Sequence, residues 1–457
     1  MRKILFVVAA IVMGLTANAK VVHVYYTDGV EEIYSSSQLG VIDFRPDGTI
    51  YITAYDGSPL SHREGVMFQR VTVDDNEAVT GTFNETLQIP YVGALSTFSR
   101  NVTRINFLYP SHDPQGNSVT LSGSIIVPRN IMNGQKKARG IVLTQRFTTI
   151  HRNDIPTYGY APTSAGVLAN PLKPNYISIE VDFYGFGCSE RFPQAFCSGI
   201  ANGQASLDAL IAGRRILKSM DIVYGDLLFN VGYSSGGYDA IATLRAAQTL
   251  EGYEHIHFDK TFAGGGPYDL AELYREYVTL DTLVYNVGLP IILSSLIENG
   301  YLDYSYEEIF TPIITGHIDD WILSKNYTTD QIKDSIGRDR TTSDLLQPAY
   351  LDLTSPESML LQTQLAQLSL NDAGWAADPS ERIYLFHSQY DEYIPFCIAQ
   401  RLVDFLLANG YVQGSQLSNA SLQVATSTTR QGHSLSAIDF FLHVAPCIKN
   451  WTLLHRD

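Results

Sequence analysis

Short apolar runs separated by helix-length stretches limit the fold of this chain more than any other feature. Continuous apolar runs lie at residues 140–143, 176–181 and 227–231, and helical periodicity fills 205–218 and 238–248. A strand that is buried on both faces reads as a continuous apolar run, and such strands form parallel sheets. The alternation therefore predicts an α/β fold in which a mostly parallel sheet is flanked by helices.

Further runs extend this sheet in both directions along the chain. Two β-rich runs at 104–109 and 119–128 come first, separated by a short turn. Later strands are expected at 383–386 and 422–425. Because a short turn joins antiparallel neighbours, this order predicts a mixed sheet with an antiparallel start. The main domain is expected to span residues 80–457.

Residues 20–79 follow another pattern, which predicts a small N-terminal antiparallel β module. Apolar and polar side chains alternate from residue 21 to residue 26. Asp-Gly pairs follow at 28–29, 47–48 and 56–57. Short alternating runs joined by Asp-Gly are typical of antiparallel hairpins. The polar, acidic segment 74–80 is expected to be the linker out of this module.

Residues 1–19 have the pattern of a cleavable export signal. Arg2 and Lys3 precede an apolar run at 4–15, and Ala17 and Ala19 form a small-x-small cleavage site. The run is shorter than the roughly 20 residues that span a bilayer. No Cys follows the cleavage site, so lipid attachment there is not expected. The product is expected to be secreted or periplasmic, without a stable membrane span.

The composition excludes several classes of partner and cofactor. The chain carries 31 Lys and Arg against 47 Asp and Glu, a formal net charge of −16. An acidic chain is repelled by phosphate backbones, so no nucleic-acid partner is expected. No group of His and Cys has zinc-binding spacing, and no Gly-rich loop has phosphate-binding spacing. We therefore predict neither a metal nor a cofactor.

A long helical insert interrupts the alternation at about 268–377. It contains the segment 289–297, which is apolar on nearly all sides. Two interpretations are open: a helix buried by packing, or part of a helical lid that lines an apolar pocket.

The sequence G-Y-S-S-G-G at 232–237 follows one buried strand and precedes a helix. This is the context of a nucleophile elbow, in which a tight strand-to-helix turn exposes a serine hydroxyl above the sheet. The flanking glycines are needed because Cβ atoms would clash in so tight a turn. Ser234 is therefore the candidate nucleophile, and the alternative is an ordinary glycine turn.

A serine hydroxyl needs a general base, which an acid in turn orients. In this type of fold the chain order is Ser, acid, His. Asp391 lies in the turn after the strand at 383–386 and is the preferred acid, with Glu392 as its nearest competitor. His433 follows the last strand on a loop and is the candidate base. His387 is the main competitor and is expected to be a packed residue at a strand end.

Two backbone N–H groups are expected to form an oxyanion hole. The first is the amide of Ser235, directly after the nucleophile. The second should come from the loop after the strand at 140–143, and Phe147 and Thr148 are the candidates.

These segments resemble the α/β-hydrolase superfamily, and within it the secretory lipase and related esterase group. The segment D-F-Y-G-F-G at 182–187 resembles the D-Y-x-G-x-G turn of that group, and 232–237 resembles its elbow. The segment 370–375, running on to Asp391 and Pro395, resembles N-x-x-x-G-W and D-x-x-V/I-P. The resemblance covers roughly residues 91–451. Two departures are Q-R-F-T at 145–148, where the group tends to have Q-H-G-T, and His387-Ser388, where H-G is usual.

The resemblance implies hydrolysis of carboxylic esters through an acyl-enzyme, on a small-molecule, lipid or carbohydrate ester. One rival is a serine peptidase of the prolyl-oligopeptidase type, which needs an anchoring carboxylate pair. Glu307 and Glu308 in the insert are the weak candidates for that pair. The other rival is a binding protein on an inactive hydrolase scaffold, with the β module as its working part.

Four cysteines, Cys188, Cys197, Cys397 and Cys447, allow three disulfide connectivities. Local pairing of 188 with 197 and of 397 with 447 is the simplest expectation, and four free thiols are the alternative.

Overall fold

The computed structural model describes residues 20–44, 49–66, 68–88, 99–169, 175–280, 282–372, 374–415, 419–427 and 430–454. The predicted export signal at 1–19 and the Asp-Gly pair at 47–48 lie outside the described residues. Among the described helices, none combines the length and hydrophobicity that crossing a membrane requires.

A ten-stranded sheet forms the centre of the main domain, in the order β15-β16-β14-β13-β12-β10-β11-β9-β8-β7. The neighbours from β7 through β9 to β11 are antiparallel, and those from β11 through β10 to β15 are parallel. The predicted mixed sheet with an antiparallel start is confirmed. Its strands are β7 (Ala78–Gln88), β8 (Ser99–His112), β9 (Ser118–Pro128), β10 (Ala138–Gln145), β11 (Tyr176–Val181), β12 (Tyr224–Tyr233), β13 (Lys260–Gly264), β14 (Ile383–His387), β15 (Gln413–Gly414) and β16 (Leu422–Thr426).

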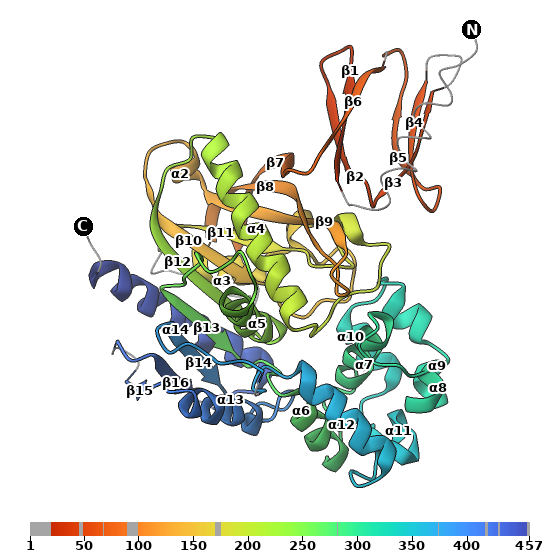
Figure 1. The fold of residues 1–457 in the computed structure, drawn as a ribbon, viewed down its shortest axis with the longest axis vertical. Helices are drawn as coiled ribbons and strands as arrows, with labels where there is room; N and C mark the ends of the chain where they lie inside the picture. Colours follow the sequence, from red (N-terminus) through yellow and green to blue (C-terminus); the bar gives the residue numbers. More distant parts are fainter. Residues whose placement is uncertain are drawn as a thin grey trace.

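Helices cover both faces of this sheet (Figure 1). On one face lie α4 (Ile200–Ser219) and α5 (Ser235–Thr249), and on the other lie α3 (Pro162–Leu168) and α14 (His433–Leu454). Successive side chains of a strand point to opposite faces. Accordingly Ile141 and Leu143 of β10 belong to one buried cluster, whereas Val142 belongs to another. The parallel strands are therefore buried on both sides, which is why their sequence reads as continuous apolar runs.

The segment between β13 and β14 is helical. Its described residues hold no strand and only one isolated bridge, between Phe310 and Leu346. In Figure 1 most of these helices group beside the body that carries the sheet. They are α6 (Leu270–Thr279), α7 (Gly288–Glu298), α8 (Tyr306–Ile309), α9 (Pro312–Thr315), a π-helix (Asp319–Leu323), α10 (Thr329–Ile336), α11 (Thr342–Leu345), a 3-10 turn (Pro348–Tyr350) and α12 (Pro356–Leu368).

The N-terminal residues form two three-stranded antiparallel sheets, β2-β1-β6 and β3-β4-β5. Apolar side chains from both sheets, including Val24 and Ile52, form one buried cluster. Figure 1 shows this module projecting from the main domain. Its strands are β1 (Val21–Tyr26), β2 (Glu31–Ser35), β3 (Leu39–Phe44), β4 (Ile50–Ala54), β5 (Pro59–Arg63) and β6 (Phe68–Asp74).

The connection out of the module is shorter than the expected 74–80 linker. Strand β6 ends at Asp74, and β7 begins at Ala78 as the edge strand of the large sheet. Most side chains of β7 are exposed or half-buried, so this strand lacks the apolar run that would mark it in the sequence. Val21 of the module packs with Ala78 and Leu108 of the large sheet, which joins the two parts.

The structure contains neither of the two predicted disulfides, because all four cysteines are free. Cys397 packs against the cluster on the α4 and α5 face of the sheet, whereas Cys447 packs against the cluster on the opposite face. Cys188 and Cys197 likewise belong to different buried clusters, although they are close in sequence. Sequence proximity was therefore a poor guide to these pairings.

Candidate active site

The turn from β12 into α5 holds Ser234 in a backbone conformation that is rare for residues other than glycine. Its φ is 61° and its ψ is −127°. Such a conformation costs on the order of 1–3 kcal/mol and persists only where the surroundings enforce it. Here the amide of Ser234 donates to the carbonyl of Gly264, at 2.8 Å, and its carbonyl accepts from the amide of Gly237, also at 2.8 Å. The turn presents the hydroxyl at the N-terminus of α5.

Two glycines of the elbow are required by close contacts between backbones. A Cβ on Gly232 would lie 1.9 Å from the carbonyl oxygen of Gly236. A Cβ on Gly236 would lie 2.5 Å from the carbonyl oxygen of Gln145, the last residue of β10, and 2.7 Å from that of Arg146, in the loop after it. The elbow therefore packs directly against the loop that was expected to supply the second oxyanion donor.

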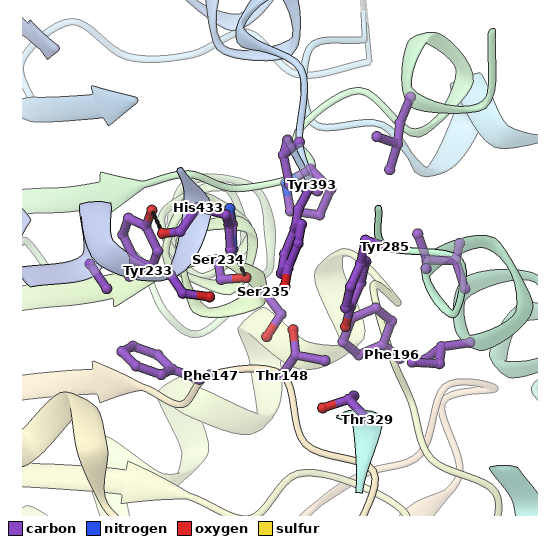
Figure 2. Close-up of a pocket in the computed structure, with 18 of the residues that line it drawn as sticks. Phe147, Thr148, Phe196, Tyr233, Ser234, Ser235, Tyr285, Thr329, Tyr393 and His433 are labelled. Atoms are coloured by element: carbon purple, nitrogen blue, oxygen red, sulfur yellow. Dashed lines mark hydrogen bonds between the residues drawn. The ribbon is translucent and has the colours of Figure 1, made fainter. Parts of the chain in front are cut away.

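Ser234, His433 and Asp391 form one chain of hydrogen bonds (Figure 2 shows the first two). The Oγ of Ser234 lies 2.8 Å from Nε2 of His433. The Nδ1 of His433 lies 2.7 Å from Oδ2 of Asp391. The structure thus brings together three side chains that are far apart in the sequence, in the arrangement that activates a serine hydroxyl.

The carboxylate of Asp391 is buried and fixed by the backbone. Its Oδ1 accepts from the amides of Tyr393, at 3.0 Å, and Ile394, at 2.8 Å. Burial opposes ionisation, but the neighbouring imidazole of His433 and these hydrogen bonds outweigh it, so the pKa of Asp391 is lowered from its usual value. Asp391 is therefore an ionised acceptor that favours the tautomer of His433 with its proton on Nδ1. This tautomer leaves Nε2 unprotonated and able to accept from Ser234.

The two competing residues have other contacts. Glu392 accepts the backbone amide of His433 through Oε2, at 2.8 Å, and so holds the histidine loop rather than the imidazole. His387 is buried, and Nε2 of its ring lies 2.8 Å from the carbonyl of Ile394 and 3.4 Å from Oδ2 of Asp391. Burial lowers the pKa of His387. We infer that this ring is neutral and donates from Nε2 to the acid turn.

Two hydrogen bonds that the sequence did not reveal hold the histidine loop, one from the acid turn and one from the last residue of β12. Ser388, at the position where the resembling group has glycine, donates its hydroxyl to the carbonyl of Gln431 at 2.6 Å. The hydroxyl of Tyr233 donates to the carbonyl of His433 at 2.6 Å. No motif in the sequence marked these bonds, because they connect loops that meet only in the folded chain.

The three candidates for the oxyanion hole lie around Ser234. Ser235 is the first residue of α5, where backbone N–H groups have no partner within the helix and carry the positive end of its dipole. Phe147 and Thr148 line the same cavity as Ser234, and Figure 2 shows Thr148 beside Ser235. The ring of Phe147 packs edge-on against Tyr233, with centroids 6.1 Å apart. A phenylalanine side chain has no hydrogen-bond donor, so only the backbone N–H of Phe147 could serve as the expected second donor.

The departure at Arg146 is explained by packing. Its guanidinium is buried and lies over the rings of Phe183, at 5.3 Å, and Phe186, at 4.5 Å. Both rings belong to the turn after β11. Burial lowers the pKa of Arg146 to about 10, so the group remains charged at neutral pH. Arg146 therefore occupies the interior next to the oxyanion loop, where it does not line the cavity.

A cavity of about 320 Å³ opens beside Ser234 and His433. The insert supplies part of its wall, including Tyr285, Ile291 and Ile292. The segment 289–297 thus has both expected properties, because Leu289 to Leu296 are buried while two of its side chains face the cavity.

A stack of aromatic rings, which the sequence did not reveal, stands beside the imidazole (Figure 2). The ring of Tyr393 stacks on His433, with centroids 5.0 Å apart and planes 26° apart. Tyr285 of the insert stacks on Tyr393 at 4.5 Å and 19°. The Nζ of Lys333, from α10, donates to the hydroxyl of Tyr393 at 3.3 Å. Tyr393 lies only two residues after Asp391, and this proximity is the one signal that could have pointed to it.

The residues suggested for a peptidase do not lie at this cavity. Glu308 completes the N-terminal capping box of α8 with Ser305, and neither Glu307 nor Glu308 lines the cavity. Among the described residues, no group of His, Cys, Asp and Glu could hold a metal ion.

Among known proteins, similarity to this chain is found in solved structures but not in sequence. No family model and no curated protein matches the sequence. A Legionella pneumophila protein provisionally described as a hydrolase aligns with 81% of this chain and 98% of its own, with a TM-score of 0.67 and 17% identity.

Two further solved structures are similar. The rice cell wall degrading esterase LipA from Xanthomonas oryzae aligns over 81% of this chain and 96% of its own, with a TM-score of 0.62 and 19% identity. Lipase A from Candida antarctica aligns over 79% of this chain and 82% of its own, with a TM-score of 0.54 and 13% identity. At these identities the likeness shows the fold alone. Together with the sheet order and its flanking helices, it shows that this chain has the α/β-hydrolase fold, extended by a helical insert and a small N-terminal β module.

Proposed function

We propose that this protein is a serine hydrolase that cleaves carboxylic esters through an acyl-enzyme. The observation that carries the proposal is the hydrogen-bonded chain from Ser234 through His433 to Asp391, which ends at a cavity. The esterase and lipase among the similar structures support the choice of ester over other substrates.

In the proposed mechanism, Ser234 Oγ attacks the ester carbonyl carbon while Nε2 of His433 takes the hydroxyl proton. Asp391 stabilises the imidazolium that forms. The protonated His433 then gives its proton to the departing alcohol, which leaves an acyl group on Ser234. A water molecule, deprotonated by His433, attacks this acyl group and releases the acid and the free serine.

The negative charge on the carbonyl oxygen is proposed to be held by two backbone N–H groups. One is that of Ser235, and the other that of Phe147 or Thr148. Loss of one such donor costs on the order of 3 kcal/mol in the barrier. The first turn of α5 supports this role, because the helix dipole favours negative charge at that position.

The proposal is tested by ester turnover in the wild type and in a Ser234→Ala variant. The wild type should hydrolyse p-nitrophenyl butyrate, and the variant should lose at least about a thousandfold in kcat. Thermal unfolding of both proteins provides the control, since the variant must keep its fold. A folded variant that retains wild-type turnover would contradict the assignment.

The peptidase alternative is tested by comparing the cleavage of p-nitrophenyl butyrate with that of aminoacyl-anilides. The described residues that line the cavity include no carboxylate pair, which supports the ester. Anilide cleavage that is faster than ester cleavage would favour the peptidase. A binding protein on an inactive scaffold would cleave neither substrate, and the intact Ser234, His433 and Asp391 chain argues against it.

We also propose that residues 1–19 act as an export signal. The basic start, the apolar run and the small residues before Lys20 support this. Intact-mass measurement of the protein recovered from outside the cytoplasm should give a chain that starts at Lys20.

A further inference from the structure

The side of the cavity that faces the insert is walled by aromatic rings. Phe196, Tyr277, Tyr285 and Tyr393 all line it. Figure 2 shows Tyr285 and Phe196 on the same side of Ser234, across the space that a bound substrate would enter. The rings come from separate parts of the chain: the loop before α4, helix α6, the segment before α7 and the acid turn.

These rings are fixed before any substrate binds. The hydroxyl of Tyr277 donates to the carbonyl of Tyr393 at 2.6 Å. Tyr285 is stacked on Tyr393, with ring centroids 4.5 Å apart. The backbone amide of Phe196 donates to the hydroxyl of Ser295 in α7 at 2.7 Å, which anchors the segment that carries this ring. Walls that are already ordered spare the entropy of ordering them on binding, so their shape selects the substrate.

The size and charge of the cavity restrict what these rings can receive. Its volume is about 320 Å³, whereas a cavity of about 150 Å³ is enough to enclose one benzene ring. The space therefore has room for one ring together with an ester group and a short link between them. Among the described residues that line the cavity there is no Lys or Arg, and Asp330 is the one acidic residue. An anionic substrate would therefore meet neither a Lys nor an Arg side chain among these described residues.

Resting on the proposed ester hydrolysis, we propose that the substrates of this site are neutral esters with an aryl group a few bonds from the scissile carbonyl. The ring packs against Tyr285 and Phe196 while the carbonyl lies at Ser234. Aromatic pairs gain more than their buried area alone provides. Hydrolysis adds one water, breaks the ester C–O bond and releases a carboxylic acid and an alcohol. No further reactant is needed.

The test uses substrates that differ only in the aryl group. On the acyl side, ethyl 3-phenylpropanoate is compared with ethyl nonanoate, which has the same number of acyl carbons. On the alcohol side, 2-phenylethyl acetate is compared with octyl acetate. Ethyl hexadecanoate tests long chains. Turnover is followed by acid release at constant pH, with all substrates below their solubility limits. Ser234→Ala is the blank.

In at least one of the two pairs, the aryl ester should have a kcat/KM about three- to tenfold above that of its alkyl partner. Ethyl hexadecanoate should be the poorest substrate. If the esters are hydrolysed in a Ser234-dependent way but neither pair favours the aryl ester, or if the long chain is preferred, the aryl inference is wrong and the proposed function stands. If Ser234→Ala hydrolyses them as the wild type does, the proposed function itself fails.

Variants then assign the preference to the aromatic wall. Tyr285→Leu should bring the aryl-to-alkyl ratio close to one, whereas Tyr285→Phe, which keeps the ring, should preserve it. Ile292→Leu on the same wall is the matched control and should also preserve it. The ratio is taken within each variant, so a general loss of activity cancels. An unchanged ratio in both Tyr285→Leu and Phe196→Leu would overturn the role of these rings.

Discussion

Replacing Asp391 by Asn gives the sharpest test of how the acid is proposed to work. In the structure, Oδ1 accepts two backbone amides and Oδ2 faces Nδ1 of His433 at 2.7 Å. If the amide oxygen of the introduced asparagine keeps the two backbone donors, its NH₂ group faces His433. The imidazole must then accept at Nδ1 and carry its proton on Nε2. That proton faces Ser234 Oγ, so the ring can no longer take the serine proton.

The expected loss follows from this change of tautomer. In Ser-His-Asp enzymes the corresponding substitution preserves the geometry but lowers kcat by about ten thousandfold, equivalent to about 5.5 kcal/mol in the barrier. We expect a loss of this order for p-nitrophenyl butyrate. Binding contacts are retained, so KM should change by less than about threefold. Thermal unfolding should show that the variant is folded.

Glu392→Gln is the matched control, because Glu392 is the adjacent carboxylate and contacts the backbone of His433 instead of its ring. It should lose less than about tenfold in kcat, because a glutamine oxygen can still accept the amide. The proposed role of Asp391 would be wrong if a folded Asp391→Asn variant lost less than tenfold in kcat, or if Glu392→Gln lost more kcat than Asp391→Asn.

Three other predictions concern the framework around the site. Gly236→Ala should lower the melting temperature and cut ester turnover at least tenfold, because its Cβ would lie 2.5 Å from the carbonyl oxygen of Gln145. The four cysteines should all be alkylated in the denatured protein without prior reduction, and reductant should leave the melting temperature unchanged. Burial raises the pKa of Glu180 to about 8. The folded state therefore holds an extra proton between the ordinary pKa and about 8, and the unfolding free energy falls as pH rises through that range. Between pH 5 and pH 9, the free energy of unfolding of the wild type should fall by at least about 1.4 kcal/mol more than that of Glu180→Gln, which is the value of one pKa unit. Urea unfolding at several pH values measures this difference. The same pH dependence in both proteins would contradict the prediction.

Much of the fold could be predicted because buried parallel strands carry a strong local signal. Strands such as β11, in which every residue is buried, stand out as continuous apolar runs. The edge strand β7 could not be recognised, since most of its side chains are at least partly exposed. The disulfide expectation failed for a related reason, because the sequence does not show that Cys397 and Cys447 pack against different faces of the sheet.

The positions of Ser234, Asp391 and His433 could be predicted because each follows a strand, and the carboxyl ends of parallel strands meet at one edge of a sheet. The rest of the site depends on contacts between distant segments. Tyr285 and Tyr393 meet across more than a hundred residues, and nothing in either local sequence indicates it.

Covalent labelling shows directly whether Ser234 is the nucleophile. The wild type is treated with a fluorophosphonate, digested, and analysed by mass spectrometry to locate the modified residue. We expect a single adduct on Ser234, no adduct in Ser234→Ala, and slow labelling in Asp391→Asn. An adduct on another serine, or full labelling of a folded Ser234→Ala variant, would contradict this assignment.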